Sequence, residues 1–296
     1  MIRAACAAIG ASLGALLQLR SPVAAVANAL AAGEDDFGSA SVTVCPLCAL
    51  PRGKQSLEPV CPSCRAEPPP WRAMVALGPY EGAIGSAVRQ LKAGPWPELG
   101  GALGPMLATQ LARRLGAMMP GLLVPRRASG SGSNVDNPPV TVLLVPVPTH
   151  LSRVVWRGID HPRVIAAAMR GELARQLPGA DAEACAFLTR KWGGKQQGYS
   201  AWRRRRRLTN TMRVSVLGAL RLRLLGSRLG QRGVGNAKRR AAARPVIVAV
   251  VVDDVVTTGS TARETLRAGR AALRRAGIRP TMWVVATVTR VDLRSE

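Results

Sequence analysis

The sequence predicts an α/β protein whose parallel β-sheet is covered by helices on both faces. In the second half of the chain, three apolar segments of strand length alternate with segments of helical periodicity. A strand buried on both faces has no polar side, so continuous apolar runs separated by helices are typical of parallel sheets. Hydrophobic residues make up 47% of the 296 residues, which is enough for a substantial core.

The predicted elements follow one another from residue 140 to residue 296. They are a strand over Val140–Pro148, a helix over Pro162–Leu177, a strand over Val246–Val252, a helix over Thr261–Ala276 and a strand over Met282–Val288. Thr261 and Glu264 have the spacing of a capping box, which marks a helix start. Gly277 marks the end of the same helix, because glycine is common just beyond a helix. We therefore assign 140–296 to one α/β domain.

Four segments of different composition precede this domain. They are an Ala-rich extension (1–44), a Cys/Pro/Gly-rich module (45–70), a segment with the three- and four-residue apolar spacing of helices (71–124) and a Gly/Ser/Asn/Pro-rich flexible joint (125–139). Within the α/β domain, the Gly- and Arg-rich residues at about 203–245 form a basic insertion. Two interpretations are open for it: a mobile flap over a site, or a solvated loop, which is the commoner case.

The charge of the chain indicates a polyanionic partner. The net charge is +25, and between Ala184 and Val252 there are seventeen Lys or Arg residues and no Asp or Glu. Such a surface attracts nucleic acids, nucleotides or phosphorylated sugars. Trp202 followed by Arg203–Arg207 combines an aromatic ring with cations, a combination that suits single-stranded DNA.

No apolar run approaches the roughly 20 residues of a membrane span, so we expect no membrane span. The first residues, MIRAACAAIGASLGALLQLR, have an early Arg and an Ala/Leu-rich middle, which leaves a signal peptide as an alternative to a short helix. The cysteine pattern favours a reducing compartment, so we expect a cytoplasmic protein.

Two C-x-x-C pairs separated by twelve residues predict a structural zinc site. The four ligands would be Cys45, Cys48, Cys61 and Cys64. Each pair can hold one side of a tetrahedral Zn²⁺, and an all-cysteine set is typical of a closed structural site. Two disulfides or a redox C-x-x-C are the alternatives. Cys6 and Cys185 remain over and are expected to be small apolar residues.

The segment VVVDDVVTTGSTARET predicts a phosphate-binding turn beside two carboxylates. The residues concerned are Asp253, Asp254, Thr257, Thr258, Gly259, Ser260 and Thr261. A parallel strand delivers the acids to its carboxyl end, where ligands of open α/β sheets bind. The turn then offers hydroxyls, backbone N–H groups and the positive end of a helix dipole, which together cradle a phosphate. The plain alternative is a strand–turn–helix connection with an ordinary cap.

The two carboxylates would repel a phosphate, so they must serve another part of the ligand. Ribose hydroxyls or a hydrated Mg²⁺ fit their charge and position. A ligand with a terminal phosphate, a sugar diol and a metal-binding pyrophosphate would use every group, and phosphoribosyl pyrophosphate is such a ligand. A Gly-Lys-Ser/Thr loop is absent from the sequence, which disfavours nucleotide hydrolysis.

This segment resembles the signature of the type I phosphoribosyltransferases: apolar residues, two acids, two spacers and T-T-G-x-T. The order of four features further resembles the ComF family of competence-associated proteins, with their gluconate-utilisation relative GntX. These features are the cysteine pairs, Tyr80-Glu81-Gly82 with Leu91-Lys92, Val145-Pro146-Val147-Pro148 followed by Arg157-Gly158, and the phosphoribosyl segment. The resemblance covers about residues 45–290.

The resemblance implies a zinc ribbon followed by a type I phosphoribosyltransferase-like domain, and a link with DNA uptake. Asp253 and Asp254 would be the catalytic pair that holds ribose and magnesium, 257–261 would bind the 5′-phosphate, and Arg157 would face the pyrophosphate. The sequence departs from the family pattern at Arg157–His161 (R-G-I-D-H). It departs again where Arg207 occupies the position at which the family has Asn.

Two functions follow from these features. The first is transfer of a phosphoribosyl group to an unidentified acceptor, with Mg²⁺ and basic groups stabilising the leaving pyrophosphate. The second is a binding module that senses a phosphoribosyl ligand, holds single-stranded DNA and works with competence-machinery proteins. No general base is evident, and His150 and His161, the two histidines, are expected at the surface.

Overall fold

The computed structural model describes residues 44–52, 58–94, 96–121, 123, 138–190, 211–231 and 245–292. Several predictions concern residues outside these ranges. They are the extension 1–43, most of the joint 125–139, Cys6, Trp202 and Arg203–Arg207.

The centre of the molecule is a five-stranded sheet in the order β1-β7-β6-β2-β3, and every neighbouring pair is parallel. Its strands are β1 (Ala73–Pro79), β2 (Val140–Pro146), β3 (Ala180–Ala184), β6 (Val246–Val256) and β7 (Met282–Arg290). The predicted parallel α/β sheet is confirmed. A separate antiparallel pair consists of β4 (Leu188–Arg190) and β5 (Met212–Val214).

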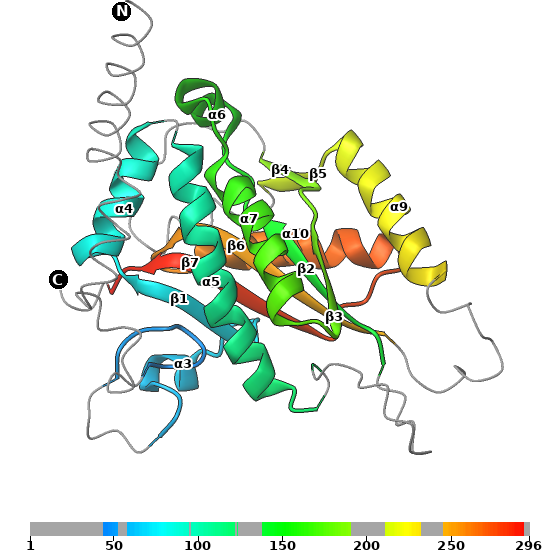
Figure 1. The fold of residues 1–296 in the computed structure, drawn as a ribbon, viewed down its shortest axis with the longest axis horizontal. Helices are drawn as coiled ribbons and strands as arrows, with labels where there is room; N and C mark the ends of the chain where they lie inside the picture. The colour runs from blue at the N-terminus through cyan, green and yellow to red at the C-terminus, as the bar shows by residue number, and fades with distance from the viewer. Residues whose placement is uncertain are drawn as a thin grey trace, which may run out of the picture.

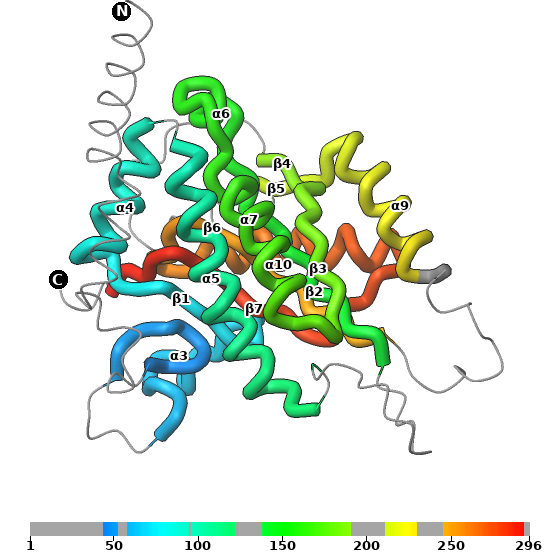
Figure 2. Tube along the Cα trace, viewed as in Figure 1, coloured from blue at the N-terminus to red at the C-terminus, as the bar shows by residue number. Residues whose placement is uncertain are grey.

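Helices cover both faces of this sheet (Figures 1 and 2). The covering helices are α4 (Gly82–Ala93), α5 (Pro97–Met118), α7 (His161–Gln176), α9 (Val216–Gln231) and α10 (Ser260–Arg275). Two short helices, α3 (Pro62–Ala66) in the cysteine module and α6 (Leu151–Arg157) after β2, bury no residue. In the figures α4, α5 and α7 lie in front of the sheet, and α10 lies behind it. No helix in the described ranges combines the length and the apolarity that crossing a bilayer requires.

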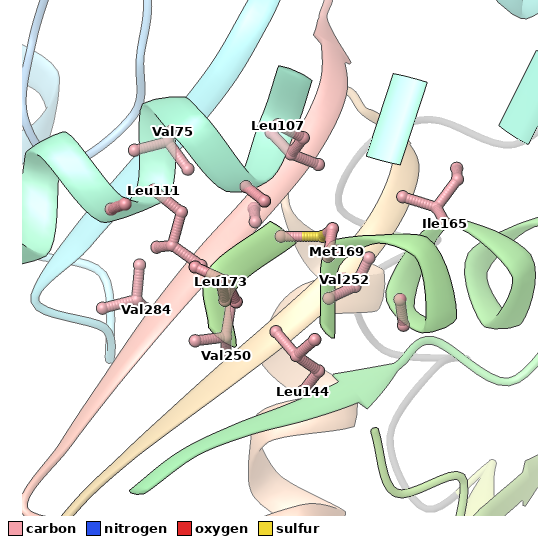
Figure 3. Packing of buried hydrophobic residues seen from close by; sticks show 14 of the residues in the cluster. Val75, Leu107, Leu111, Leu144, Ile165, Met169, Leu173, Val250, Val252 and Val284 are labelled. Atoms are coloured by element: carbon pink, nitrogen blue, oxygen red, sulfur yellow. The ribbon is translucent and has the colours of Figure 1, made fainter. Parts of the chain in front are cut away.

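The central strands are apolar at nearly every position because alternate side chains enter two different cores. Leu144, Val250 and Val252 point towards α5 and α7, where they pack with residues such as Leu107 and Met169 (Figure 3). Their neighbours along the strands enter the second core, which α10 covers. This second core includes Leu143, Val145, Ala249, Val251, Leu266 and Leu273. Burial on both faces is the reason that these strands lack polar alternation.

The prediction that residues 71–124 are helical throughout is wrong for Ala73–Pro79. These residues form β1, which pairs with β7 along its length, so they extend the same sheet as residues 140–290. A short apolar run has no clear period, and for that reason it cannot be assigned to strand or helix from periodicity alone.

The described part of the basic insertion is neither a flap nor a solvated loop. Residues 212–214 form β5 and residues 216–231 form α9. Leu222 and Leu225, three positions apart, are buried against the second core, and this contact holds the helix on the domain. The many arginines and glycines of this stretch concealed a helix.

The ends of α10 follow the prediction at one side only. At the carboxyl end, the N–H groups of Gly277 and Ile278 donate to the carbonyls of Arg274 and Leu273, which is the Schellman pattern with a left-handed glycine. At the amino end the predicted Thr261–Glu264 capping box is wrong. The carboxylate of Glu264 binds Arg267 instead, at 2.7 and 2.8 Å, so it does not reach back to the helix start.

Helices α5 and α7 touch through glycine, and this contact sets how close they lie on the sheet. A Cβ atom added to Gly104 would lie 2.5 Å from the Cβ of Ala168 and 2.9 Å from the carbonyl oxygen of Ile165. Gly101, one turn earlier on α5, has nothing within 4 Å of the same atom. The two positions therefore form a matched pair for testing the helix contact.

We predict opposite effects for alanine at these two positions. Gly104→Ala should lower the free energy of unfolding by about 1–3 kcal/mol, because the added methyl group overpacks the α5–α7 contact. Gly101→Ala should raise it by about 0.5–1 kcal/mol, because alanine favours the helical backbone more than glycine does. Urea denaturation followed by circular dichroism measures both, and equal effects of the two substitutions would contradict the close contact.

Candidate functional site

The candidate site lies where β6 separates from β2, and the region between the carboxyl ends of these two strands is called the crevice below, after the usual ligand position in open α/β sheets. The pairing of β2 with β6 ends at Pro146 and Val252, and one further bond joins the Val147 N–H to the Val252 carbonyl at 2.8 Å. On its other side β6 stays paired with β7 as far as Val256. The prediction that the strand ends at Val252 is therefore too short, since the two acids lie within the strand. They lie where β6 has lost its β2 neighbour.

The order of the sheet makes this crevice the usual place for a ligand. After β2 the chain passes through α6 and α7 to β3 on one side, and it returns to β6 on the other side of β2. Ligands of open α/β sheets bind outside the carboxyl ends of the strands, at the point where the strand order reverses. Here that point lies between the ends of β2 and β6.

Asp253 and Asp254 supply two adjacent carboxyl groups to the crevice. Asp253 is 7% exposed, and burial, reinforced by the neighbouring charge of Asp254, raises its pKa well above the ordinary carboxyl value. Asp254 is more open, and its Oδ2 lies 3.7 Å from Nζ of Lys92 on α4. Two adjacent carboxyl groups, one of them desolvated, are stabilised by a bound cation or by hydroxyl donors.

The turn from Thr257 to Ser260 carries hydroxyl groups and free backbone donors. Gly259 has φ +74°, the left-handed conformation that glycine adopts most readily, and directly precedes the first turn of α10. The hydroxyls of Thr258 and Ser260 lie 2.8 Å apart. Within the described ranges, the backbone N–H groups of Thr257, Gly259 and Thr261 have no acceptor. The predicted phosphate-binding residues therefore lie together at the start of a helix, as anion sites do.

Side-chain contacts join the cysteine module to this turn. A Cβ atom at Gly259 would lie 3.0 Å from the Trp71 ring, so the ring contacts the turn directly. The indole N–H of Trp71 donates to the Leu47 carbonyl at 2.7 Å, which ties the ring to the module. Arg290 donates to the carbonyls of Cys48 and Val256 at 3.0 and 2.9 Å. The end of β6 and the cysteine module are thus joined through two side chains.

The facing wall of the crevice comes from the connection between β2 and α7. Thr149 donates to Asp160 at 2.8 Å, and Arg163 pairs with the same carboxylate at 2.9 Å. Arg157, a predicted ligand-binding residue, ends α6. Burial and the charge of Arg153 lower its pKa, against the opposing effect of Asp254, and its buried Nε has no partner within the described residues.

His161 is not the surface residue that the sequence led us to expect. It is 1% exposed, and within the described part of the chain neither ring nitrogen has a hydrogen-bond partner. Burial lowers its pKa; the charge of Asp254 acts in the opposite direction, while those of Arg157 and Lys92 add to the lowering. His150, by contrast, caps α6 by accepting a bond from the Ser152 N–H.

Sequence reasoning did not assign Lys92, Asp160, His161 or Arg190 to the site. The pKa of Arg190, at the end of β4, is lowered by burial and by Arg153, while Asp253 opposes that shift, so this guanidinium belongs to the same electrostatic cluster. Lys92 was quoted only as part of a family pattern. Lys92 lies near the end of α4, the helix that follows β1. Its place beside the site could not be predicted because β1 had not been recognised as a strand of the sheet.

The four cysteines of the module form one cluster. The Sγ atoms of Cys45, Cys48, Cys61 and Cys64 all lie within 4.8 Å of one another, and all four are free thiols. The Cys48 and Cys61 sulfurs are 3.8 Å apart. Zn–S bonds of about 2.3 Å in a tetrahedron place sulfurs at about this distance. The cluster could bind one structural zinc ion, and the disulfide alternative is not adopted.

The thiols of the cluster differ in their environment. Burial would raise the pKa of Cys45, but backbone donors, above all the Cys61 N–H, bring it down to about 7. Burial and the charges of neighbouring thiols raise the pKa of Cys48 to about 11 and also raise that of Cys64. Cysteines bind a metal ion as thiolates, and the cation stabilises their neighbouring negative charges. Cys185, outside the cluster, is buried as expected for a small apolar residue.

Comparison with known proteins finds relatives along most of the chain. The chain is 29% identical to DNA utilization protein YhgH of Salmonella typhi over 75% of this chain and 76% of that protein. It is also 29% identical to DNA utilization protein YhgH of Escherichia coli (strain K12), over 78% of this chain and 81% of the relative. A scan against models of protein families finds no match. The similarity therefore extends over about three quarters of this chain and of each relative.

We predict that His161 titrates below the ordinary histidine value of 6.5. A buried neutral imidazole contributes fully to stability at higher pH, and that contribution is lost as the pH falls below about 6.5. Because the chain has two histidines, NMR of the imidazole resonances can separate them, with His150→Gln as the assignment control. A pKa of 6.5 or above for His161 would contradict this description of the crevice.

Proposed function

We propose that the crevice binds phosphoribosyl pyrophosphate together with Mg²⁺ and transfers the phosphoribosyl group to an acceptor. One observation carries the proposal. The hydroxyl-rich turn at the start of α10 and two adjacent carboxylates, one of them buried, lie together where β6 leaves β2. A ligand must offer a phosphate to the turn and cations or hydroxyls to the carboxylates. Phosphoribosyl pyrophosphate with its metal offers both.

The residues divide between the parts of this ligand. The backbone donors and hydroxyls of 257–261 would hold the 5′-phosphate, since this is where a helix dipole and free N–H groups coincide. Asp253 and Asp254 would accept bonds from the ribose hydroxyls and from water on magnesium. Arg157, whose buried Nε lacks a partner among the described residues, would face the pyrophosphate. Lys92 would balance the charge of Asp254 until the ligand brings its own cation.

Catalysis in this arrangement would be electrostatic. The bond between the anomeric carbon and the pyrophosphate oxygen breaks, the acceptor's nucleophilic atom bonds to that carbon, and the acceptor's proton passes to the departing pyrophosphate or to water. Bound magnesium would neutralise charge on the departing pyrophosphate. The carboxylate pair would stabilise the positive charge that develops on the ribose, and Arg157 would stabilise the negative charge of the departing pyrophosphate.

The cysteine cluster would hold the turn in place through a structural zinc ion. Tetrahedral spacing of the thiols and a Cys45 pKa of about 7 support a thiolate–metal site. The type I phosphoribosyltransferase class, a ComF-like identity, association with competence-machinery proteins and a cytoplasmic location belong to the same proposal. They rest on the resemblance, on the reduced cysteines and on relatives named for DNA utilization.

A second candidate is a binding module without catalytic turnover. It would sense the phosphoribosyl ligand in the crevice and bind single-stranded DNA elsewhere on its surface. The net charge of +25 and the name of the relatives, DNA utilization protein, favour it. Pyrophosphate release separates the two candidates. Release with an acceptor that stops in the Asp253→Asn, Asp254→Asn variant supports the enzyme, whereas ligand binding without release supports the module.

We predict that the double substitution Asp253→Asn with Asp254→Asn separates binding from stability. Affinity for phosphoribosyl pyrophosphate with Mg²⁺, measured by calorimetry, should fall by at least about tenfold, the worth of one charge-assisted hydrogen bond. The melting temperature should stay the same or rise, because burial already disfavours the charge on Asp253. Asp181→Asn on β3 is the matched control. Unchanged affinity in the double variant would refute the assignment.

We predict about one zinc ion for each folded chain, lost on substitution within the cluster. Cys61→Ser should reduce the zinc content, measured by mass spectrometry of the metal, to near zero and lower the melting temperature, because binding energy of such a site is folding energy. Cys185→Ala, which changes a buried cysteine outside the cluster, should keep the zinc. A purified chain that folds with four free thiols and no metal would contradict the zinc site.

A further inference from the structure

A second cavity, of about 710 Å³, lies at the amino ends of β1 and β7, away from the crevice. Four arginines from three segments line it. Arg270 and Arg274 come from the last turns of α10, Arg279 from the loop before β7, and Arg72 from the residue before β1. Cations near the end of a helix stabilise its dipole, which accounts for Arg274. That effect does not account for Arg72 or Arg279, which belong to other segments.

The charge of this arginine cavity is uncompensated within the described structure. All four arginines are exposed, and no acidic residue lines the cavity. Other arginines on the surface of the domain have carboxylate partners: Arg163 pairs with Asp160, and Arg267 pairs with Glu264. None of the four cavity arginines has such a partner within the described ranges. Guanidinium groups that converge without a counter-charge form a binding site for phosphate groups.

The same cavity has an apolar wall. Pro69, Met282 and Trp283 contribute it, and Trp71 lies at its border. Trp283 is anchored against α10, since a Cβ atom at Gly269 would lie 2.9 Å from its ring. Trp71 and Trp283 are 6% and 4% exposed, so the accessible part of this wall comes from Pro69 and Met282. A ligand that fits must therefore carry several negative charges and also present an apolar group. Inorganic polyphosphate lacks the second property, and an acidic peptide lacks rings in register with its charges.

We propose that the arginine cavity binds single-stranded nucleic acid. The backbone phosphates would lie on Arg72, Arg270, Arg274 and Arg279, and an unstacked base would enter the cavity beside Met282 and Trp283. A single strand exposes both groups to the protein, whereas a duplex keeps its bases stacked inside. The proposal adds a location to the DNA-binding half of the second candidate function, and it does not depend on the ligand in the crevice.

The experiment measures binding of a fluorescently labelled oligothymidylate by anisotropy at several salt concentrations. Each phosphate contact contributes about 0.7 to the slope of log affinity against log salt for a single strand. The variant Arg270→Gln with Arg274→Gln should therefore lower the magnitude of the slope by about 1.4 and weaken binding by about tenfold at moderate salt. An oligouridylate and an oligodeoxyuridylate, which differ only in the 2′-hydroxyl, form the second arm and tell whether the sugar affects recognition.

The matched control is Arg113→Gln with Arg170→Gln, which removes the same charge from exposed positions on α5 and α7. This variant should change the affinity by less than about twofold. Equal weakening by both double variants would overturn the proposal, because it would mean general attraction to a +25 chain. If the glutamine variant fails to fold, Arg270→Lys with Arg274→Lys keeps the charge. That variant should retain the salt slope and lose affinity, because lysine lacks the bidentate fork.

An abasic strand tests the apolar wall. It should bind at least about fivefold more weakly than oligothymidylate, since stacking of one base supplies that much. Equal binding would overturn the assignment of a base to the cavity. The Asp253→Asn, Asp254→Asn variant should bind the oligonucleotide as the unaltered chain does, and the arginine variant should still bind phosphoribosyl pyrophosphate. Failure at one site is thus distinguishable from failure at the other.

Discussion

The double pairing of β6, with β2 on one side and β7 on the other, is the constraint on which the rest of the molecule depends. Because both neighbours are parallel and both faces are covered, the strand is apolar as far as Val252. Beyond this residue only β7 remains paired. The loss of one neighbour leaves Asp254 partly open and Asp253 buried, while the other neighbour still holds the backbone of both residues. A carboxylate pair is thus held rigidly without being sealed inside the sheet.

This pairing also explains why the site is assembled from distant parts of the chain. Proline at position 146 ends the pairing of β2, and the chain then turns away through Thr149 to Asp160 and His161. The crevice is therefore bounded by the end of one strand and the beginning of α7. Lys92 reaches it from α4 because β1 extends the sheet beyond β7. Each of these positions follows from the strand order and needs no special loop.

The sequence was sufficient for the features whose local pattern has one structural solution. A double acid after an apolar run, followed by Thr-Thr-Gly, predicts a strand, a turn and a helix, and all three are present, although the strand runs on to Val256. The two C-x-x-C pairs predicted a metal site, and their four sulfur atoms lie together. Predictions failed where the local pattern was ambiguous and tertiary contacts decided the structure. The short apolar run of β1 has no clear period, and the Glu264 carboxylate binds Arg267, so it does not cap the helix start. The helix α9 is held on the domain by Leu222 and Leu225.

Trp71 shows how the module and the domain act as one unit. Its ring contacts Gly259 in the candidate phosphate turn, its indole N–H is held by the Leu47 carbonyl beside the cysteine cluster, and Arg263 of α10 lies 5.4 Å above it. The same side chain lines both the arginine cavity and a cavity of about 270 Å³ between the cysteine cluster and the turn. A movement of the ring would change both cavities and the turn together. Packed side chains transmit small shifts and do not absorb them. The cysteine cluster therefore helps to position the turn and both cavities. It fixes the one aromatic side chain that all three regions share.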